Sequence, residues 1–167
     1  MPGLVIVEGD SDRVALETLA KRRGRDLAKE GVEIVAIGGA HAIRRYLEKL
    51  RADGNSLKLV GLVDAAQEDV FRRVAIDLYV CDTDLEDELI RALGIEGVEK
   101  VIEAQGELSS LRSLQKQPAQ RGRTSLQHIR RFMGSKSGRK SLYARLMVEA
   151  LDLDAMPKPL DGVLAHV

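Results

Sequence analysis

The sequence predicts an α/β fold with a mostly parallel sheet of four to five strands flanked by helices. Short β-branched runs alternate with amphipathic helical patterns through residues 1–104, and the connections between them are short. The pattern then changes and becomes helical and basic. A chain of 167 residues can build one sizeable core. We therefore expect residues 1–104 to form the α/β core and residues 105–167 to form a helical basic extension packed on the same domain.

The strands are expected where aliphatic and β-branched residues cluster between Gly, Asp or Glu: residues 4–7, 32–37, 57–63, 78–81 and 98–102. The helices between them are expected where apolar residues recur at helical spacing: residues 11–29, 40–50, 65–74 and 85–93. Gly94 closes the last of these helices. Right-handed crossovers between parallel strands then place helices on both faces of the sheet.

The extension is expected to be helical. Leu108, Leu111 and Leu114 share one face of a helix that Pro118 ends. Two more helices are expected at residues 125–133 and 137–151, and the tail beyond Met156 is expected to lie along the surface.

Composition excludes several classes of protein. Lys plus Arg and Asp plus Glu number 26 each, which excludes a uniformly basic nucleic-acid binder but not a locally polarised one. The single Cys81 excludes an intramolecular disulfide and a zinc site built from cysteines. The N-terminal apolar run is too short for a signal peptide or a membrane span, so a cytoplasmic location without membrane contact is expected. Aromatic residues are only 3%, which disfavours a base-stacking platform.

Charge is distributed unevenly. Residues 105–140 contain nine basic residues and one acid, whereas residues 77–88 contain six acids and no base. The acids could hold a cation and the bases could hold phosphates; alternatively, both are solvated faces that pair with each other. The basic residues that we expect at a nucleic acid are Arg121, Arg123, Arg130, Arg131, Lys136, Arg139 and Lys140.

Acids follow three of the expected strands. Glu8 follows the first, Asp64 the third, and Asp82 and Asp84 the fourth. Because the carboxyl ends of parallel strands share one edge of a sheet, these side chains should converge. Carboxylates brought together repel one another unless a cation neutralises them, and oxygen ligands suit Mg²⁺ or Mn²⁺.

Neighbouring acids extend this group. Asp12, in the first turn of the next helix, should lie above Glu8, and Glu68 follows Asp64 by one helical turn. For each single acid, capping of a helix N-terminus is the competing interpretation. Capping does not explain Glu8, which precedes a glycine and a second acid.

Residues 4–12, with the pattern Leu-Val-Ile-Val-Glu-Gly-x-Ser-Asp, resemble the opening motif of a Toprim domain, a Rossmann-like metal-binding unit. The similarity is greatest to the Toprim domain of the OLD (overcoming lysogenization defect) nucleases, to which residues 37–40, 61–64 and 84–90 also correspond. It covers residues 4 to 93, and the basic extension resembles the same branch more loosely.

The resemblance implies a two-metal phosphodiesterase. One Mg²⁺ or Mn²⁺ would bind near Glu8, Asp12 and Asp64, and a second near Asp64, Glu68 and residues 84–86. OLD-type nucleases also use a lysine after the sheet, for which Lys140 is the candidate; the competing interpretation is a surface lysine. The expected catalytic residues are thus Glu8, Asp64 and Lys140, and the expected metal ligands are Glu8, Asp12, Asp64, Glu68, Asp84 and Glu86.

Two features depart from the family pattern. The usual Asp-x-Asp motif ends here in Ala66, so that either Glu68 or Asp69 supplies the second carboxylate one turn later or the second metal is weakly bound. OLD proteins also carry an ATPase domain before the Toprim domain, whereas this chain begins at the Toprim strand, which makes a separate ATPase chain a candidate partner. Residues 134–141 superficially resemble a P-loop but are one residue short and follow a helix, so ATP binding there is rejected.

Three functions follow from these observations. The first is a Mg²⁺- or Mn²⁺-dependent endonuclease or nickase acting on DNA, with a homodimer as one candidate assembly. The second is a degenerate Toprim module that binds metal and nucleic acid and docks to a separate ATPase chain, which Ala66 favours. The third, a receiver-like domain, ranks last because acids, and not a lysine, follow the strand at 78–81. A topoisomerase or primase is disfavoured.

Overall fold

A four-stranded parallel sheet lies at the centre of the computed structural model, which describes residues 2–38, 40–54, 56–74 and 76–167. The strands are β1 (Gly3–Val7), β2 (Val32–Ala36), β3 (Lys58–Asp64) and β4 (Asp77–Cys81), and their order in the sheet is β2-β1-β3-β4. All three pairings are parallel. The α/β class and the mostly parallel sheet are therefore confirmed.

The register brings the carboxyl ends of the strands to one edge. Val7 at the end of β1 pairs with Ala36 and Leu62, and Asp64 at the end of β3 pairs with Cys81. Because β1 and β3 are adjacent in the centre of the sheet, the residues that follow them emerge side by side.

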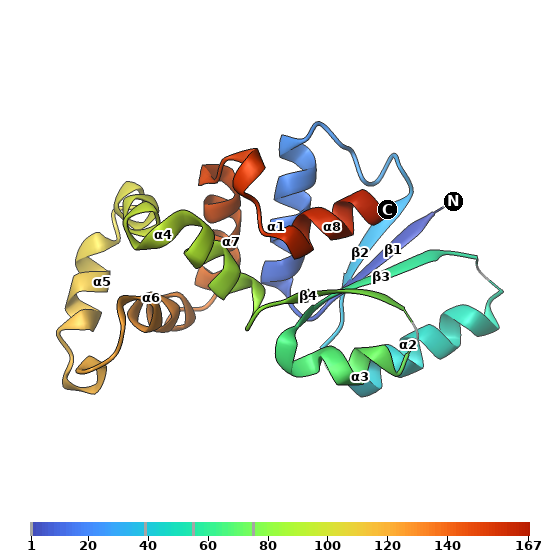
Figure 1. Ribbon diagram of the computed structural model, residues 1–167, viewed down its shortest axis with the longest axis horizontal. Helices are drawn as coiled ribbons and strands as arrows, with labels where there is room; N and C mark the ends of the chain where they lie inside the picture. The colour runs from blue at the N-terminus through green and yellow to red at the C-terminus, as the bar shows by residue number, and fades with distance from the viewer. Residues whose placement is uncertain (1, 39, 55, 75) are drawn as a thin grey trace.

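Helices cover both faces of the sheet, as the sequence predicted (Figure 1). Helices α2 (Ala40–Ala52) and α3 (Glu68–Arg72) lie on one face, and α1 (Asp10–Arg22) and α8 (Lys158–His166) lie on the other. Helix α7 (Arg139–Ala150) packs against α1 on the side away from the strands. The strands alternate between these two faces. In β1, Leu4 and Ile6 join the cluster under α2 and α3, whereas Val5 and Val7 join the other cluster.

Helices α4 (Leu85–Ala104), α5 (Leu108–Gln115) and α6 (Ser125–Gly134) form a lobe beside the sheet (Figure 1). Short 3₁₀ turns at Ala65–Gln67, Pro118–Gln120 and Leu153–Ala155 complete the chain. The predicted helix end at Gly94 is confirmed as a break, because Gly94 has φ 76° and ψ 161° inside α4. Helical structure resumes beyond it.

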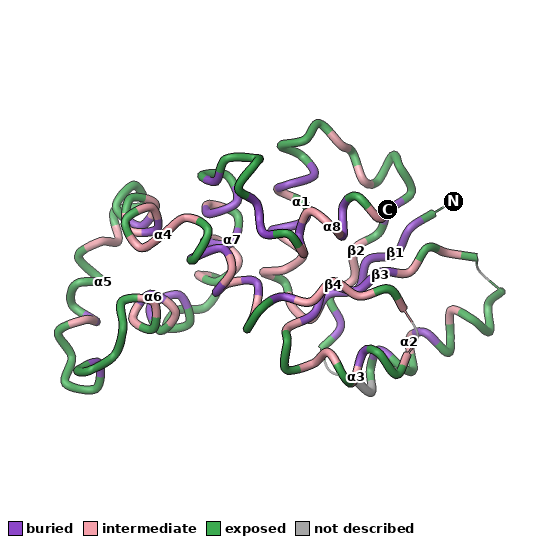
Figure 2. The backbone as a smooth tube through the Cα atoms, viewed as in Figure 1, coloured by how far each residue is buried: buried purple, intermediate pink, exposed green. Residues whose placement is uncertain are grey.

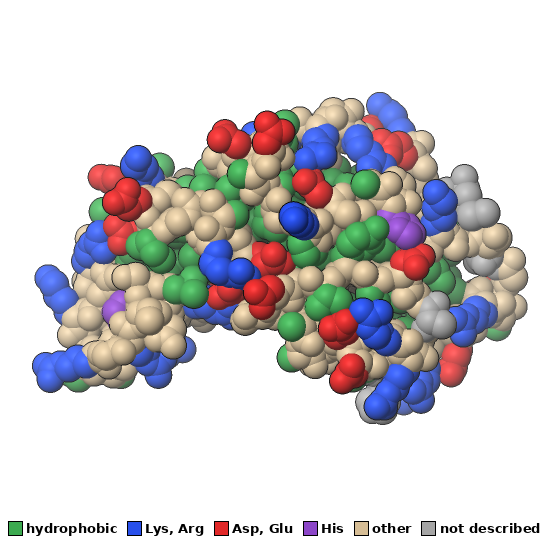
Figure 3. Space-filling model, viewed as in Figure 1, with side chains coloured by type: hydrophobic (Ala, Val, Ile, Leu, Met, Phe, Trp, Pro, Cys, Tyr) green, Lys and Arg blue, Asp and Glu red, His purple; other side chains and the backbone are tan. Residues whose placement is uncertain are grey.

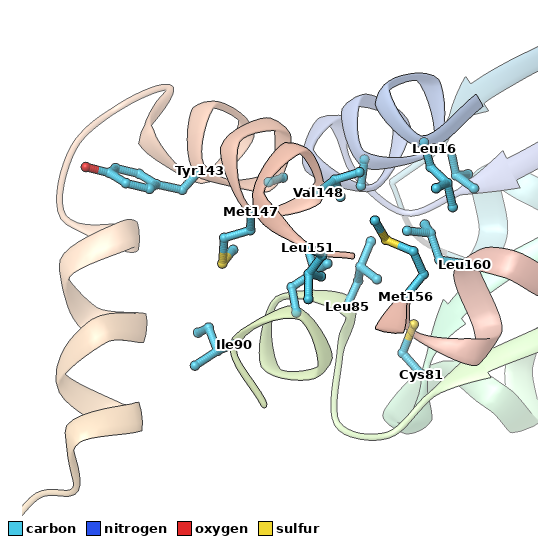
Figure 4. Close-up of a cluster of buried hydrophobic side chains, with 14 of the residues drawn as sticks. Leu16, Cys81, Leu85, Ile90, Tyr143, Met147, Val148, Leu151, Met156 and Leu160 are labelled. Atoms are coloured by element: carbon cyan, nitrogen blue, oxygen red, sulfur yellow. The ribbon is translucent and has the colours of Figure 1, made fainter. Parts of the chain in front are cut away.

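One hydrophobic cluster runs from the sheet into the lobe. Helix α7 packs between α1 and α4, and its Met147 and Val148 contact side chains from both directions (Figure 4). The purple segments of Figure 2 mark this buried path through α7. The basic extension is therefore part of the core and positions the lobe against the sheet.

Three expectations about local structure were wrong. Residues 98–102 belong to α4 and are not a fifth strand; Val98 and Ile102 are both buried at helical spacing. The first helix ends at Arg22, before Gly24 turns the chain with φ 72°. The tail beyond Met156 does not simply lie along the surface, because it forms helix α8, in which Leu160, Val163 and Leu164 are buried.

One residue of the predicted motif at residues 37–40, Gly39, lies outside the described residues. The helix expected at 65–74 is shorter, with one 3₁₀ turn before α3. None of the helices in the described part of the chain is long and apolar enough to cross a membrane.

Candidate metal centre

The predicted acids gather around one cleft of about 210 Å³ at the carboxyl edge of the sheet. Glu8 and Asp64 reach it from the ends of β1 and β3, Asp12 from the first turn of α1, and Asp84 and Glu86 from the start of α4. The residues that line it are Glu8, Gly9, Ser11, Asp12, Asp64, Asp84, Leu85, Glu86 and Lys140. Five of the six predicted metal ligands and the predicted lysine thus surround a single cavity.

Local hydrogen bonds hold the first group of acids. The backbone N–H of Asp64 donates to Glu8 Oε2 at 3.3 Å, which joins the ends of β1 and β3. The N–H of Gly9 donates to Asp12 Oδ2 at 3.0 Å, so Asp12 provides a hydrogen-bond acceptor for the backbone N–H that precedes α1. Asp64 makes no capping bond to the 3₁₀ turn that follows it. Capping therefore accounts for one oxygen of Asp12 and for neither Glu8 nor Asp64.

Charge repulsion and burial dominate this group. Burial, together with the side-chain hydrogen bond and the charge of Asp64, raises the pKa of Glu8 to about 8, although the backbone N–H of Asp64 acts to lower it. Burial likewise raises the pKa of Asp12 to about 6 and raises that of Asp64 above its ordinary value. Within the described residues, no Lys, Arg or His lies within ion-pair distance of these three carboxylates. Lys140 and Arg130 act on Asp64, and Lys140 on Asp12, only from beyond that distance, so these acids have no direct ion-pair partner among the described residues.

The donor chemistry fits a hard divalent cation, since all three groups are carboxylates. Among the described residues, no three acidic, His or Cys side chains are already drawn together at metal-ligand spacing. The backbone thus places the donors around one cleft, and closing them on a cation requires side-chain rotation.

The acids at the start of α4 have a different environment. Asp84 caps the helix by accepting from the Asp87 N–H at 2.8 Å, as the capping interpretation predicted. Arg130, from α6, donates to both oxygens of Asp84 at 2.9 and 2.5 Å. Although burial acts to raise it, these hydrogen bonds hold the pKa of Asp84 below its ordinary value. Burial raises the pKa of Glu86.

The loop before α4 is conformationally restricted. Thr83 has φ 66°, a left-handed conformation that is rare for a β-branched residue. Its carbonyl accepts a hydrogen bond from the Ala65 N–H at 3.3 Å, which ties the segments after β3 and β4 together. This connection directs Asp84 toward the cleft, whereas Asp82 points away and pairs with Arg91.

The predicted ligand Glu68 does not line the cleft. Its carboxylate accepts hydrogen bonds from Arg72, one turn along α3, at 2.9 and 2.5 Å. Asp69, on the same helix, and Ala66 are exposed.

The predicted basic residues have several different environments. Arg139 is mostly buried, donates to Glu107 Oε2 at 2.6 Å and lies 4.1 Å over the ring of Phe132. Lys140 lies on the cleft with Nζ 4.0 Å from Glu86 Oε2. The others are exposed, and none of them has an ion-pair partner in the part of the chain described here: Arg121, Arg123, Arg131 and Lys136. Figure 3 shows Lys and Arg side chains at the outer end of the lobe.

Sequence reasoning missed the role of Arg130. It placed this residue at a nucleic acid, whereas the structure places its guanidinium on Asp84, 46 residues earlier in the chain. The sequence contained one signal for such a contact. Residues 77–88 are acidic and residues 105–140 are basic, and pairing between these two segments was one interpretation of that distribution.

The family comparison agrees with the motifs. Residues 2–65 match the model of the "Overcoming lysogenization defect protein-like, TOPRIM domain". This range includes Glu8, Asp12 and Asp64 but not Asp84, Glu86 or Lys140. No curated protein matches the chain.

Solved structures show the same fold over nearly the whole chain. The C-terminal region of the Xanthomonas campestris pv. campestris OLD protein aligns with a TM-score of 0.66 at 21% identity, covering 98% of this chain and 92% of that one. The C-terminal region of the Burkholderia pseudomallei OLD protein aligns with a TM-score of 0.65 at 20% identity, covering 98% and 94%. The expected resemblance is confirmed: residues 2–65 match the OLD-like Toprim model, and the fold of the OLD C-terminal regions extends over the helical lobe as well.

Proposed function

We propose that this OLD-like Toprim domain hydrolyses phosphodiester bonds of DNA with bound Mg²⁺ or Mn²⁺, as an endonuclease or nickase. One observation carries the proposal: Glu8, Asp12 and Asp64 surround an open cleft without an ion-pair partner among the described residues, and Lys140 lies on the same cleft. A structural cluster of acids would be paired within the fold, because unpaired carboxylates in proximity are costly.

Glu8, Asp12 and Asp64 would hold the cation, which supplies charge stabilisation for the phosphate and lowers the pKa of water. Glu8 and Asp64 extend from adjacent strands of a rigid sheet, so their backbones are fixed relative to each other. Lys140, at the first turn of α7, would contact a phosphate oxygen from the opposite wall of the cleft.

The lobe would hold the DNA by its backbone. Arg121, Arg123, Arg131 and Lys136 are exposed and free of described ion pairs, and such cations bind phosphates without reading sequence. Arg139 has its guanidinium on Glu107, so its contribution would be to support the lobe.

Ala66 favours a second candidate function. The chain lacks one carboxylate of the usual motif, and Glu68 does not replace it in the cleft. A catalytically degenerate module would still bind metal and nucleic acid and would dock to a separate ATPase chain.

Plasmid nicking distinguishes the two candidates. We expect the purified chain to nick supercoiled DNA in Mn²⁺ or Mg²⁺, not in EDTA, and Glu8→Gln to abolish nicking. Glu33→Gln, an exposed acid on β2, is the matched control and should cut like the parent. Absence of nicking under every metal, with DNA binding retained, would support the degenerate module; equal cutting by Glu8→Gln would refute the assignment of this centre.

A further inference from the structure

The second cation implied by the family resemblance lacks a fitting set of ligands in this chain. The expected set was Asp64, Glu68 and residues 84–86. Position 66 carries a methyl group, and the carboxylate of Glu68 bonds to Arg72 outside the cleft. Asp84 and Glu86 are the only remaining acids of that set besides the shared Asp64.

Both oxygens of Asp84 are already engaged. Oδ1 accepts from the Asp87 N–H at 2.8 Å and from an Arg130 nitrogen at 2.9 Å, and Oδ2 accepts from the other Arg130 nitrogen at 2.5 Å. A planar guanidinium matches a carboxylate through two parallel hydrogen bonds. A Mg²⁺ ion, which needs an oxygen at about 2.0–2.1 Å, would have to displace that guanidinium.

Two other acids at the start of α4, Glu86 and Asp87, also face positive charge. Arg130 lies 3.4 Å from Asp87 and 3.9 Å from Glu86. Lys140 Nζ is 4.0 Å from Glu86, and Arg91 Nε is 2.6 Å from Asp87. Asp84 and Glu86, the acids that line this side of the cleft, are therefore compensated by side chains of the protein.

The opposite side of the cleft is less well compensated: Glu8, Asp12 and Asp64 have no ion pair among the described residues, and Lys140 and Arg130 act on Asp12 or Asp64 only from a greater distance. A cation gains most where negative charge is unbalanced. We propose that the chain binds a single divalent cation, at Glu8, Asp12 and Asp64, and that the positive charge of Arg130 replaces that of a second cation in the cleft. This inference rests on the proposed function. Arg130 is then a positioning residue, which fixes Asp84 and links α6 to α4.

Counting bound Mn²⁺ tests this inference without any assay of cleavage. Titration calorimetry on the full chain should give one Mn²⁺ per parent chain. Arg130→Ala, which frees Asp84, should bind two, whereas Arg130→Lys, which keeps the charge, should bind one. The control is Arg131→Ala, the adjacent exposed residue without a described ion pair, and it should also bind one.

The outcomes separate the two proposals. Two Mn²⁺ per parent chain would overturn the single-cation inference and leave the proposed function intact, whereas no bound Mn²⁺ would overturn the proposed function itself. A folded Arg130→Ala variant that still binds one ion would overturn the role assigned to Arg130. If that variant does not fold, Arg130→Gln, which retains donors for Asp84 without the charge, replaces it under the same criterion.

Discussion

Replacing Glu8 by Gln should stabilise the metal-free protein at alkaline pH. Burial and Asp64 raise the pKa of Glu8 from 4.5 to about 8, so the folded state holds a proton that the unfolded chain has already lost. The parent should therefore lose stability as pH rises from 4.5 to about 8. Asp12, raised from 3.8 to about 6, acts in the same direction over its own range. Gln remains neutral throughout and removes the contribution of Glu8.

The size of the effect follows from the pKa and from the exposure of the side chain. One pKa unit corresponds to about 1.4 kcal/mol, so the full difference would be about 5 kcal/mol. Glu8 is only half-buried and faces a solvent-filled cleft, and screening by water reduces this to about 1–2 kcal/mol. Glu8→Gln should exceed the parent in stability by that amount at pH 8 and match it near pH 4.

Urea unfolding in EDTA at both pH values measures this difference, with Glu33→Gln as the control that should follow the parent. Adding Mn²⁺ at about 100 times its dissociation constant should then stabilise the parent by about 2.7 kcal/mol and leave Glu8→Gln unchanged. A variant that is no more stable than the parent at pH 8 would refute the argument that burial and Asp64 raise the pKa of Glu8.

Three further perturbations test the lobe, the packing of the tail and the DNA surface. Glu107→Ala leaves the mostly buried Arg139 without its carboxylate and should cost about 2–3 kcal/mol in urea unfolding; a loss below 0.5 kcal/mol would show the pair to be dispensable. Gly162→Ala places a methyl group 2.3 Å from the ring of Tyr79 and should lower stability by about 1–3 kcal/mol, measured as a drop in Tm; an unchanged Tm would mean that the ring moves aside freely. Arg131→Ala should weaken DNA binding equally across sequences and flatten the dependence of log K on log salt by about 0.9 per lost phosphate contact; an unchanged slope would mean that this surface is only solvated.

The sequence predicted the sheet well because buried parallel strands are short aliphatic runs bounded by turn residues. The same signal failed at residues 98–102, since a short apolar run does not distinguish a strand from a buried helical turn. The tail was misjudged for a related reason. Its apolar residues recur with helical spacing, but nothing local indicates that α8 covers the sheet beside β3 and β4.

The candidate site, like the fold, could be predicted from the sequence only in part. The convergence of Glu8, Asp64 and Asp84 follows from strand order alone, because parallel strands deliver their carboxyl ends to one edge. The position of Glu68 could not be inferred, since a 3₁₀ turn before α3 changes the direction in which its side chain leaves the sheet. The contact of Arg130 with Asp84 depends on how the lobe packs, which no local pattern records.

Ala66 and Arg130 both make the charge at this edge of the sheet less negative. Relative to the Asp-x-Asp pattern, Ala66 removes one negative charge, and Arg130 adds one positive charge to the acids at the start of α4. Together they change the charge at this edge by two, which is the charge of one divalent cation. The double variant Ala66→Asp with Arg130→Ala reverses both changes. It should therefore bind a second Mn²⁺ more tightly than Arg130→Ala alone, and equal affinities in calorimetry would show that the two positions act independently.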